Sequence, residues 1–458
     1  MSYGLASVAK QLFGSAGLRR AIGNTGWLIA ERVIRLLYGV FVGAWVARFL
    51  GPSDFGTLNY AIAFVALFTS LTHFGLHGLV VRDIVRDPPG AGETLGTAFV
   101  IRLLGGIISF ALVLLTAAQL HSDATTKVLI AILGTGLVFQ AFDVIDLWFQ
   151  AQVQSKYSVI VKSASIGVAA AAKVAMIVAD APVVAFAAAT AAEMALGAVG
   201  LVVAYWYQGL RLSAWRATFV RGRELLGQSW PLILSAIGAK INLDIDKVML
   251  GRMADASVVG SYSAAARLSE LWYFVPVAIV SSVFPALVRS RQMGQSIYKA
   301  RMQSLYDVLL CLSVTVALVV ALSSDFVVHL LFGNAYADAA RILSVHVWAG
   351  IFTFQAAALS KWLINEGLLK FSFIRHVLGA IVNVALNLVL IPRYGGMGAA
   401  VATVISYATS GWLACFVYPK TRVAGVQMAL AFLAPIKLPL QILRGEWRPG
   451  GVVEGGRM

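Results

Sequence analysis

Long apolar stretches dominate this 458-residue chain and limit what it can fold into. Twelve of them reach the length of about twenty residues that a helix needs to cross a bilayer. They run at 22–47, 55–80, 94–118, 128–150, 157–179, 183–207, 227–250, 259–288, 303–332, 341–365, 369–392 and 396–419. Continuous runs predict transmembrane helices, whereas a membrane barrel would show ten-residue alternation. The sequence therefore predicts an all-α polytopic membrane protein.

The overall composition supports this class. The chain is 59% hydrophobic and only 12% charged, whereas soluble domains carry about 25% charged residues. The formal net charge is +15, and its bases fit loops that lie against anionic lipid. We therefore expect the lipid bilayer, and no nucleic acid, as a partner. The two cysteines, Cys311 and Cys415, lie in apolar runs and indicate neither a disulfide framework nor a metal site.

The basic residues predict an orientation. The N-terminal tail and the even-numbered connections contain fifteen Lys and Arg residues, and the odd-numbered connections contain about five. Because cytoplasmic loops carry the excess of positive charge, we expect both termini and the central connection to be cytoplasmic.

The two halves of the chain resemble each other. RFLGPSDFG, from Arg48 to Gly56, matches RMADASVVG, from Arg252 to Gly260, at a separation of 204 positions. Near a separation of 214, FQAFDVIDLWFQAQ matches FQAAALSKWLINEG, and KYSVIVK matches KFSFIRH. Six crossings per repeat give both halves the same orientation in the membrane. We therefore expect two six-helix lobes, related by a pseudo-two-fold axis along the membrane normal and facing a central cleft.

This pattern predicts five segments. They are a cytoplasmic amphipathic segment at 1–21, an N-lobe at 22–207, an interfacial linker at 208–226, a C-lobe at 227–419 and a cytoplasmic tail at 420–458. The linker alternates apolar residues with arginines, which is typical of a helix in the headgroup region. Within the tail, 424–443 is apolar but broken by prolines, and we interpret it as interfacial or re-entrant. A thirteenth span there is the alternative, and it would place the C-terminus outside.

Charged residues inside the apolar segments are the candidates for function. Glu31, Arg32 and Arg35 lie in the first segment. Glu31 and Arg35 are four apart and can pair along one helix face. Arg32 then needs a wet cavity, a partner helix or an anionic ligand, because an unpaired charge at that depth is costly.

Later segments carry further charges of this kind. Lys240 and Asp244 form another pair at a spacing of four in the seventh segment, and Arg267 lies in the eighth. Asp143 and Asp146 share a face of the fourth segment, which has no base of its own. Either they bind H⁺ or Na⁺, as coupling carboxylates do, or a base on a neighbouring helix pairs with them. With Glu31 and Asp244 they are our candidates for ion coupling.

Two absences in the sequence narrow the function. The sequence contains no GxxxxGK[ST] loop, which nucleotide-driven transport would require. The expected outer loops are also too short to hold the catalytic base and acceptor site of a membrane glycosyltransferase. We therefore expect a transporter and not an enzyme, with no cofactor other than a coupling H⁺ or Na⁺.

The N-terminal region resembles a known family. The stretch Arg48–Gly56, followed by Tyr60 and by Gly75 and Leu76, looks like the signature of bacterial polysaccharide flippases. These are the Wzx-type transporters of the multidrug/oligosaccharidyl-lipid/polysaccharide (MOP) superfamily. The resemblance is strongest over residues 22–110 and extends loosely to about residue 420.

The resemblance implies a flippase of the bacterial inner membrane. Such proteins move undecaprenyl-diphosphate-linked oligosaccharide from the cytoplasmic to the periplasmic leaflet, by alternating access coupled to an ion gradient. They supply O-antigen, exopolysaccharide or capsule synthesis, alongside a polysaccharide polymerase and a chain-length regulator. Arg32, Arg35, Lys240 and Arg267 would bind the diphosphate or the glycan, because arginine forks suit phosphate oxygens. A cation-coupled multidrug exporter and a peptidoglycan-precursor flippase of the same superfamily are the alternatives.

Overall fold

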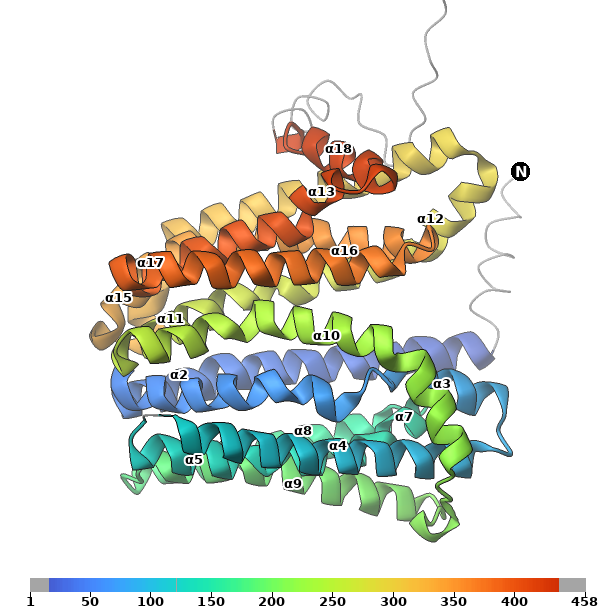
Figure 1. The fold of residues 1–458 in the computed structure, drawn as a ribbon, viewed down its shortest axis with the longest axis horizontal. Coiled ribbons are helices and arrows are strands. Elements are labelled where there is room, and N and C mark those ends of the chain that lie inside the picture. Colours follow the sequence, from blue (N-terminus) through green and yellow to red (C-terminus); the bar gives the residue numbers. More distant parts are fainter. Residues whose placement is uncertain (1–15, 121, 436–458) are drawn as a thin grey trace, which may run out of the picture. The chain divides into compact units, whose positions relative to one another are not determined.

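The computed structural model describes residues 16–120 and 122–435, and these residues form helices joined by short connections (Figure 1). They divide into two compact units. The first contains the chain up to Leu50 together with Ala61–Ile237. The second contains Gly51–Tyr60 together with the chain from Gly238 onward.

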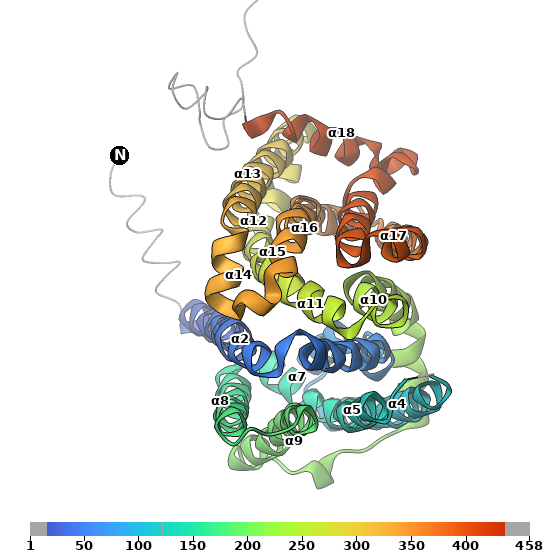
Figure 2. The same cartoon turned by 90° about the vertical axis from the view of Figure 1, so that its left-hand side faces the viewer.

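The first unit is built mainly from long helices. They are α2 (Ala16–His73), α3 (His77–Arg86), α4 (Ala91–Gln119), α5 (Ala124–Gly134), α6 (Gly136–Phe139), the 3₁₀ turn η1 (Gln140–Asp143), α7 (Val144–Ala151), α8 (Lys156–Val178) and α9 (Val183–Tyr207). Seen end-on in Figure 2, α8 lies beside α9 and α5 lies beside α4. The core between α7 and α9 contains Ile145, Phe149, Leu201 and Tyr205.

The second unit is also built from helices. They are the part of α10 (Phe219–Met253) from Gly238, then α11 (Ala256–Glu270), η3 (Leu271–Tyr273), α12 (Phe274–Met293), α13 (Gln295–Leu322), α14 (Ser324–Phe332), η4 (Asn334–Tyr336), α15 (Ala337–His346), α16 (Ala349–Asn365), α17 (Leu369–Gly411), η5 (Leu413–Phe416), η6 (Pro419–Thr421) and α18 (Arg422–Ala431). Helix α12 packs against α13 and α16, and α16 packs against α17. Their shared core includes Tyr306, Leu309, Phe354 and Leu359.

The helices are long and apolar enough for a polytopic membrane protein. The described residues contain eight candidate spans, or nine if the bent pair Asn334–His346 and Ala349–Asn365 forms one. All twelve apolar ranges of the sequence coincide with helices. The count is lower because Gly26–Arg86 contains two of the expected ranges and Lys370–Phe416 contains another two. Helix α10 is not among the eight, since the charged stretch KINLDIDK interrupts its apolar sequence.

A glycine interrupts the helix in each of the two stretches that contain two expected ranges. Gly51 in α2 has φ 68° and Gly395 in α17 has φ 53°, so the backbone leaves the helical conformation at these points. Glycine adopts positive φ readily because it has no Cβ. At 61 and 47 residues, the two stretches are long enough for more than one crossing each.

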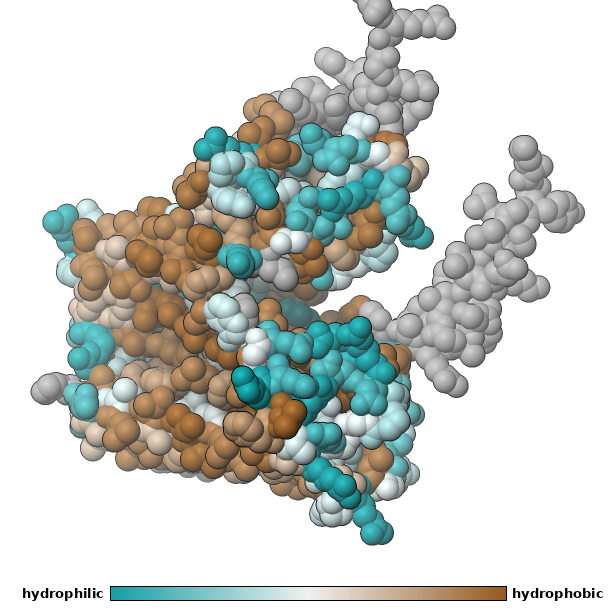
Figure 3. Space-filling model, turned by 45° about the vertical axis from the view of Figure 1, so that its right-hand side comes forward, coloured by the Kyte–Doolittle hydropathy of each residue, from teal (hydrophilic) through white to brown (hydrophobic). Residues whose placement is uncertain are grey.

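Apolar side chains cover the outside of the helices in each unit, and hydrophilic ones gather toward the helix ends (Figure 3). On α4, for example, Ile108 and Leu115 are exposed, and so is Val319 on α13. Exposed apolar surface of this extent indicates contact with lipid.

The linker expected at 208–226 is helical only in part, because residues 219–226 form the start of α10 and the preceding residues do not form a long helix. Between α9 and α10 there is only the short turn η2 (Leu212–Ala214), followed by residues without regular structure up to Phe219. Trp215 is drawn inward because its Nε1 donates a hydrogen bond to the Tyr205 hydroxyl at 3.0 Å. The backbone N–H of Arg216 donates to the Gly92 carbonyl at 3.2 Å. These contacts hold Trp215 and Arg216 against α9 and α4.

The two terminal predictions lie largely outside the described residues. Residues 1–15 of the expected amphipathic segment are not described, and neither are residues 436–443 of the expected re-entrant segment. The described part of the latter contains α18, whose ten residues are too few to cross a bilayer.

Candidate functional site

The first unit contains a charged cavity of about 290 Å³. It is bounded by α2, by the region of η1, and by α8 and α9. Its charged lining residues are Arg35, Asp143, Lys162 and Glu193. Charged groups at membrane depth face a cavity or a partner because lipid cannot solvate them. This cavity is therefore the strongest candidate for a polar ligand in the first unit.

Lys162 pairs with Asp143 of this cavity and with the neighbouring Asp146. Its Nζ lies 2.6 Å from Asp146 Oδ2 and 3.8 Å from Asp143 Oδ1. Gln150 Nε2 also donates to Asp146 at 3.2 Å. The base therefore comes from the neighbouring helix α8, which is the second of the two interpretations of this acid pair. Lys162 closes the motif KYSVIVK, but the sequence could not show that it faces Asp146.

In α2, Glu31 and Arg35 form the ion pair that their spacing of four predicts. Arg35 Nη2 lies 3.0 Å from Glu31 Oε1, and the Arg35 side chain remains half exposed. Arg32 is exposed and forms no ion pair with any residue that the structure describes. Further along α2, Tyr38 donates to Glu193 at 3.1 Å and accepts a hydrogen bond from Lys173 at 2.8 Å. Arg35 and Glu193 bring one base and one acid to the same cavity.

In the second unit, the predicted residues lie on α10 and α11. Asp244 pairs with Lys240 at 2.7 Å and with Lys247 at 3.3 Å. The guanidinium carbon of Arg267 lies 5.6 Å from the centre of the Phe55 ring, which is a cation–π distance. Asp244 is thus shared between two lysines, of which the sequence identified only Lys240 as a ligand candidate.

Asp246 forms a buried network that the sequence did not single out. It is 1% exposed and accepts hydrogen bonds from Tyr262 at 2.9 Å, from Thr403 at 2.7 Å and from Asn387. These donors come from α11 and α17, so the carboxylate joins three helices. Asp246 lies only two residues from Asp244, and its partners on α11 and α17 are too distant in the sequence to be predicted by local spacing.

A second cavity, of about 320 Å³, lies in the second unit. Its lining combines aromatic and small residues with one buried base, Arg375. Arg375 donates to Ser360 Oγ at 2.9 Å and to the Ser410 carbonyl at 3.2 Å. Tyr273 and Tyr407 lie on the same cavity, with ring centres 6.4 Å apart.

The two cavities use corresponding positions of the internal repeat. Asp143 and Lys162 line the first cavity, and Ala357 and His376, which are 214 positions later, line the second. Arg35 and His73 line the first, and Ala239 and Val277, 204 positions later, line the second. These are the separations at which the sequence motifs match. The agreement supports an internal duplication.

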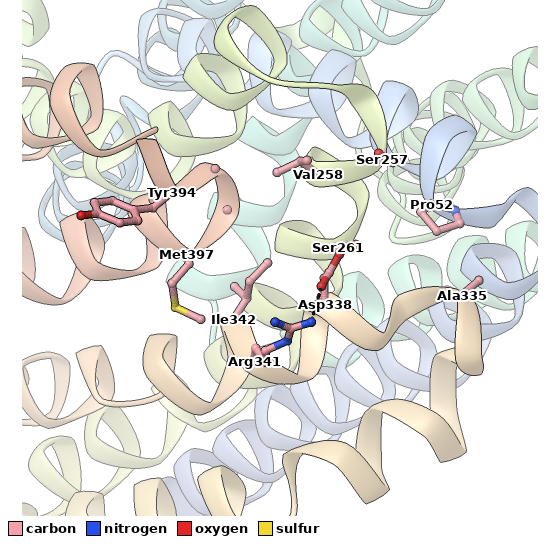
Figure 4. A pocket seen from close by; sticks show the side chains of 12 residues that line it. Pro52, Ser257, Val258, Ser261, Ala335, Asp338, Arg341, Ile342, Tyr394 and Met397 are labelled. Carbon is pink, nitrogen blue, oxygen red and sulfur yellow. Dashed lines mark hydrogen bonds and ion pairs between the residues drawn. The ribbon is translucent and has the colours of Figure 1, made fainter. Parts of the chain in front are cut away.

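A third cavity, of about 350 Å³, is drawn in Figure 4. Its lining includes Pro52, Ser261 and Tyr394, with an ion pair between Arg341 and Asp338 at 3.2 Å. Both charged side chains are about three-quarters exposed. Exposed pairs of this kind contribute little, so this cavity is a weaker candidate than the other two.

The chain is similar in sequence to known proteins. Residues 22–291 match the family described as "Polysaccharide biosynthesis protein". The chain is 25% identical over 215 residues to the "Probable low-salt glycan biosynthesis flippase Agl15" of Haloferax volcanii. That match covers 46% of this chain and 45% of Agl15, so the chain spans less than half the length of this relative.

Solved structures share the fold over most of the chain. "Lipid II flippase MurJ, inward closed conformation" aligns with a TM-score of 0.69 at 14% identity, covering 92% of this chain and 96% of MurJ. An inward-facing multidrug resistance MATE family transporter of the MOP superfamily aligns with a TM-score of 0.66 at 16% identity, covering 88% of this chain and 95% of the transporter. At such identities the likeness is one of fold, and it supports a two-lobe architecture.

The resemblance seen in the sequence is thereby confirmed. The matched range 22–291 covers more than half of the chain, and the relatives are transporters and not enzymes. This protein belongs to the polysaccharide biosynthesis protein family and has the MOP superfamily transporter fold.

Proposed function

We propose that this protein is a flippase that moves undecaprenyl-diphosphate-linked oligosaccharide from the cytoplasmic to the periplasmic leaflet of the bacterial inner membrane. Membership of the polysaccharide biosynthesis family supports a role with glycans. Agl15, which is named as a probable glycan biosynthesis flippase, and MurJ, which is named as a lipid II flippase, support the transport of a lipid-linked glycan.

The observation that carries the proposal is the charged cavity of the first unit. Arg35 and Lys162 line it among apolar helices, where a base is stable only with a partner. Asp146 and Asp143 provide that partner for Lys162. A diphosphate entering the cavity competes with these carboxylates for Lys162, and it meets Arg35, whose side chain is half exposed. Arginine forks match phosphate oxygens.

The other binding and coupling residues follow the sequence predictions. Arg32, Lys240 and Arg267 join Arg35 as ligands for the diphosphate or the glycan. The coupling candidates are Glu31, Asp143, Asp146 and Asp244, which exchange H⁺ or Na⁺ as their lysine or arginine partners engage the substrate. Each of the four except Asp143 lies within 3.0 Å of a basic side chain, and Asp143 lies within 3.8 Å.

The proposed topology has twelve crossings. The glycine breaks at Gly51 and Gly395 divide the two longest stretches, and α10 supplies the seventh crossing. With the sequence repeat, we infer an N-lobe at 22–207 and a C-lobe at 227–419, related by a pseudo-two-fold axis and facing a central cleft. Both termini are then cytoplasmic, and a polymerase and a chain-length regulator receive the product.

Reconstitution in proteoliposomes tests the proposal. The probe is a polyprenyl-diphosphate-linked oligosaccharide, and translocation is scored as protection from a glycan-modifying enzyme added outside. We expect protection that grows with time only when the protein is present. Failure to translocate, combined with export of a cationic dye driven by a proton gradient, would assign the protein to the multidrug-exporter branch.

A further inference from the structure

Arg375 is a buried base without an acidic partner among the residues that the structure describes. Its residue is 2% exposed, and it lies on α17 within the second unit. A guanidinium has five N–H donors; one donates to Ser360 Oγ and one to the Ser410 carbonyl. Its Nε is buried and has no hydrogen-bond partner within the described part of the chain. Burying an uncompensated charge is expensive, so buried bases are normally paired.

The first unit has an acid, Asp146, at the position that matches Ser360, the serine beside Arg375. There, Lys162 of α8 donates to Asp146 of α7. In the second unit Arg375 of α17 donates to Ser360 of α16, and Ser360 follows Asp146 by 214 positions. At the same separation Ala357 replaces Asp143. The second cavity therefore has neutral residues at the positions of both carboxylates. It has His376 at the position of Lys162, and Arg375 is one residue before it.

The cavity around Arg375 has room for an anionic group on an apolar chain. Its volume is about 320 Å³, and Val277, Phe352 and Ala356 line it together with Arg375. Val277 is 44% exposed, so the cavity is open beside it. Arg375 is six residues from Leu369, where α17 begins, which is about 9 Å along the helix axis. Arg375 therefore lies near the N-terminal end of this long apolar helix, and the charged end of a lipid would need to reach such a position.

We propose that the cavity binds the phosphate of a lipid headgroup, with its oxygens on the free N–H groups of Arg375 and its chain along the apolar lining. One base with no acid matches one negative charge, which is the charge of a phosphodiester. Arginine binds such oxyanions through two parallel hydrogen bonds. The site is separate from the charged cavity of the first unit, and its occupancy does not depend on whether the protein flips glycans.

Lipid binding to the purified protein tests this inference. Native mass spectrometry compares dioleoylphosphatidylglycerol with dioleoylglycerol, which has the same chains and no phosphate. We expect the phosphatidylglycerol adduct to weaken about tenfold or more in Arg375→Met, as for the loss of a charge-assisted hydrogen bond. Arg375→Lys should retain part of the binding. Arg341→Met, which removes an exposed arginine of the same unit, should leave it unchanged.

A second variant keeps Arg375 and gives it the carboxylate partner that Lys162 has in the first unit. Ser360→Asp places a carboxylate where Asp146 stands, beside the guanidinium, and should abolish phosphatidylglycerol binding while raising thermal stability. Undecaprenyl phosphate and inorganic phosphate are added in separate arms. Preference for either over phosphatidylglycerol, with the same loss in Ser360→Asp, would keep the anion site and change its source. Equal binding of phosphatidylglycerol by the wild type and Ser360→Asp would overturn the inference.

Discussion

Gly56 and Gly260 each pack against the backbone of the other's segment. A Cβ on Gly56 would overlap the Ala256 carbonyl, and a Cβ on Gly260 would overlap the Pro52 carbonyl. Gly56 and Gly260 are 204 positions apart, and so are Pro52 and Ala256. Reciprocal contacts of this kind are typical of a two-fold relationship. The contact therefore supports the internal duplication that the sequence predicts.

Replacing either glycine should disturb the close approach. Gly56→Ala and Gly260→Ala are each expected to lower the free energy of unfolding by about 2 kcal/mol, as overpacking does. Gly167→Ala is the control, because a Cβ at Gly167 would meet no atom of the described residues within 4 Å. It should be neutral or gain up to about 1 kcal/mol from helix propensity. Equal thermal stability of all three variants in detergent would contradict the contact.

The Lys162–Asp146 pair should behave as a coupled unit. Lys162→Met leaves a buried carboxylate without its base and should cost about 3 kcal/mol. Asp146→Asn alone should be destabilising for the converse reason. The double variant should recover much of the loss, which a double-mutant cycle measures. The exposed Arg341–Asp338 pair is the control, and its cycle should give less than about 1 kcal/mol. Additive losses at Lys162 and Asp146 would refute the pairing.

The Asp246 network should be a strong determinant of stability in the second unit. Asp246→Ala leaves the donors of Tyr262, Thr403 and Asn387 without their acceptor, at a cost of roughly 3 kcal/mol or more. Tyr262→Phe removes one donor only and should cost about 1 kcal/mol. Thermal unfolding followed by circular dichroism ranks the two variants. The network would be unimportant if Asp246→Ala unfolded at the wild-type temperature.

Asp123, which lies outside the candidate spans, should make a pH-dependent contribution to the stability of the protein. It caps the N-terminus of α5 by accepting a hydrogen bond from the Thr126 N–H at 3.1 Å. Partial burial raises its pKa, but hydrogen bonds from the side chain and backbone of Thr126, with others from the backbone, outweigh this and lower the pKa below 3.8. A lowered pKa means that the stabilisation is complete above the unfolded value and is lost as pH falls through the folded value.

The cap is tested by comparing stability at two pH values. Asp123→Ala should cost about 1 kcal/mol at pH 7, and the difference from the wild type should shrink as the pH falls below 3.8. Asp123→Ser keeps a capping oxygen that does not titrate, so it isolates the effect of the charge. A difference between wild type and Asp123→Ala that stays constant down to pH 3 would rule out the titrating cap.

Several features could be predicted from the sequence because they depend on local patterns. Apolar length predicted every long helix, and the spacing of four predicted the Glu31–Arg35 and Lys240–Asp244 pairs. Contacts between helices could not be predicted in this way. Lys162 and Arg375 lie in similar motifs, KYSVIVK and KFSFIRH, yet one has a carboxylate partner and the other a serine. In the linker, residues 219–226 are α-helical and 208–218 are not. Trp215 in the second of these stretches contacts Tyr205 of α9, a tertiary partner that an amphipathic pattern does not reveal.

The most direct test of the central claim is the rate of lipid-linked oligosaccharide translocation in proteoliposomes containing the wild type, Arg32→Met/Arg35→Met or Lys162→Met. All three proteins must first be shown to be folded and equally reconstituted. We predict that the wild type translocates the oligosaccharide, and that each variant does so at least about tenfold more slowly, as expected when a charged hydrogen bond to the diphosphate is lost. Translocation at the wild-type rate in both variants would contradict the role of the charged cavity. No translocation by the wild type would contradict the flippase assignment itself.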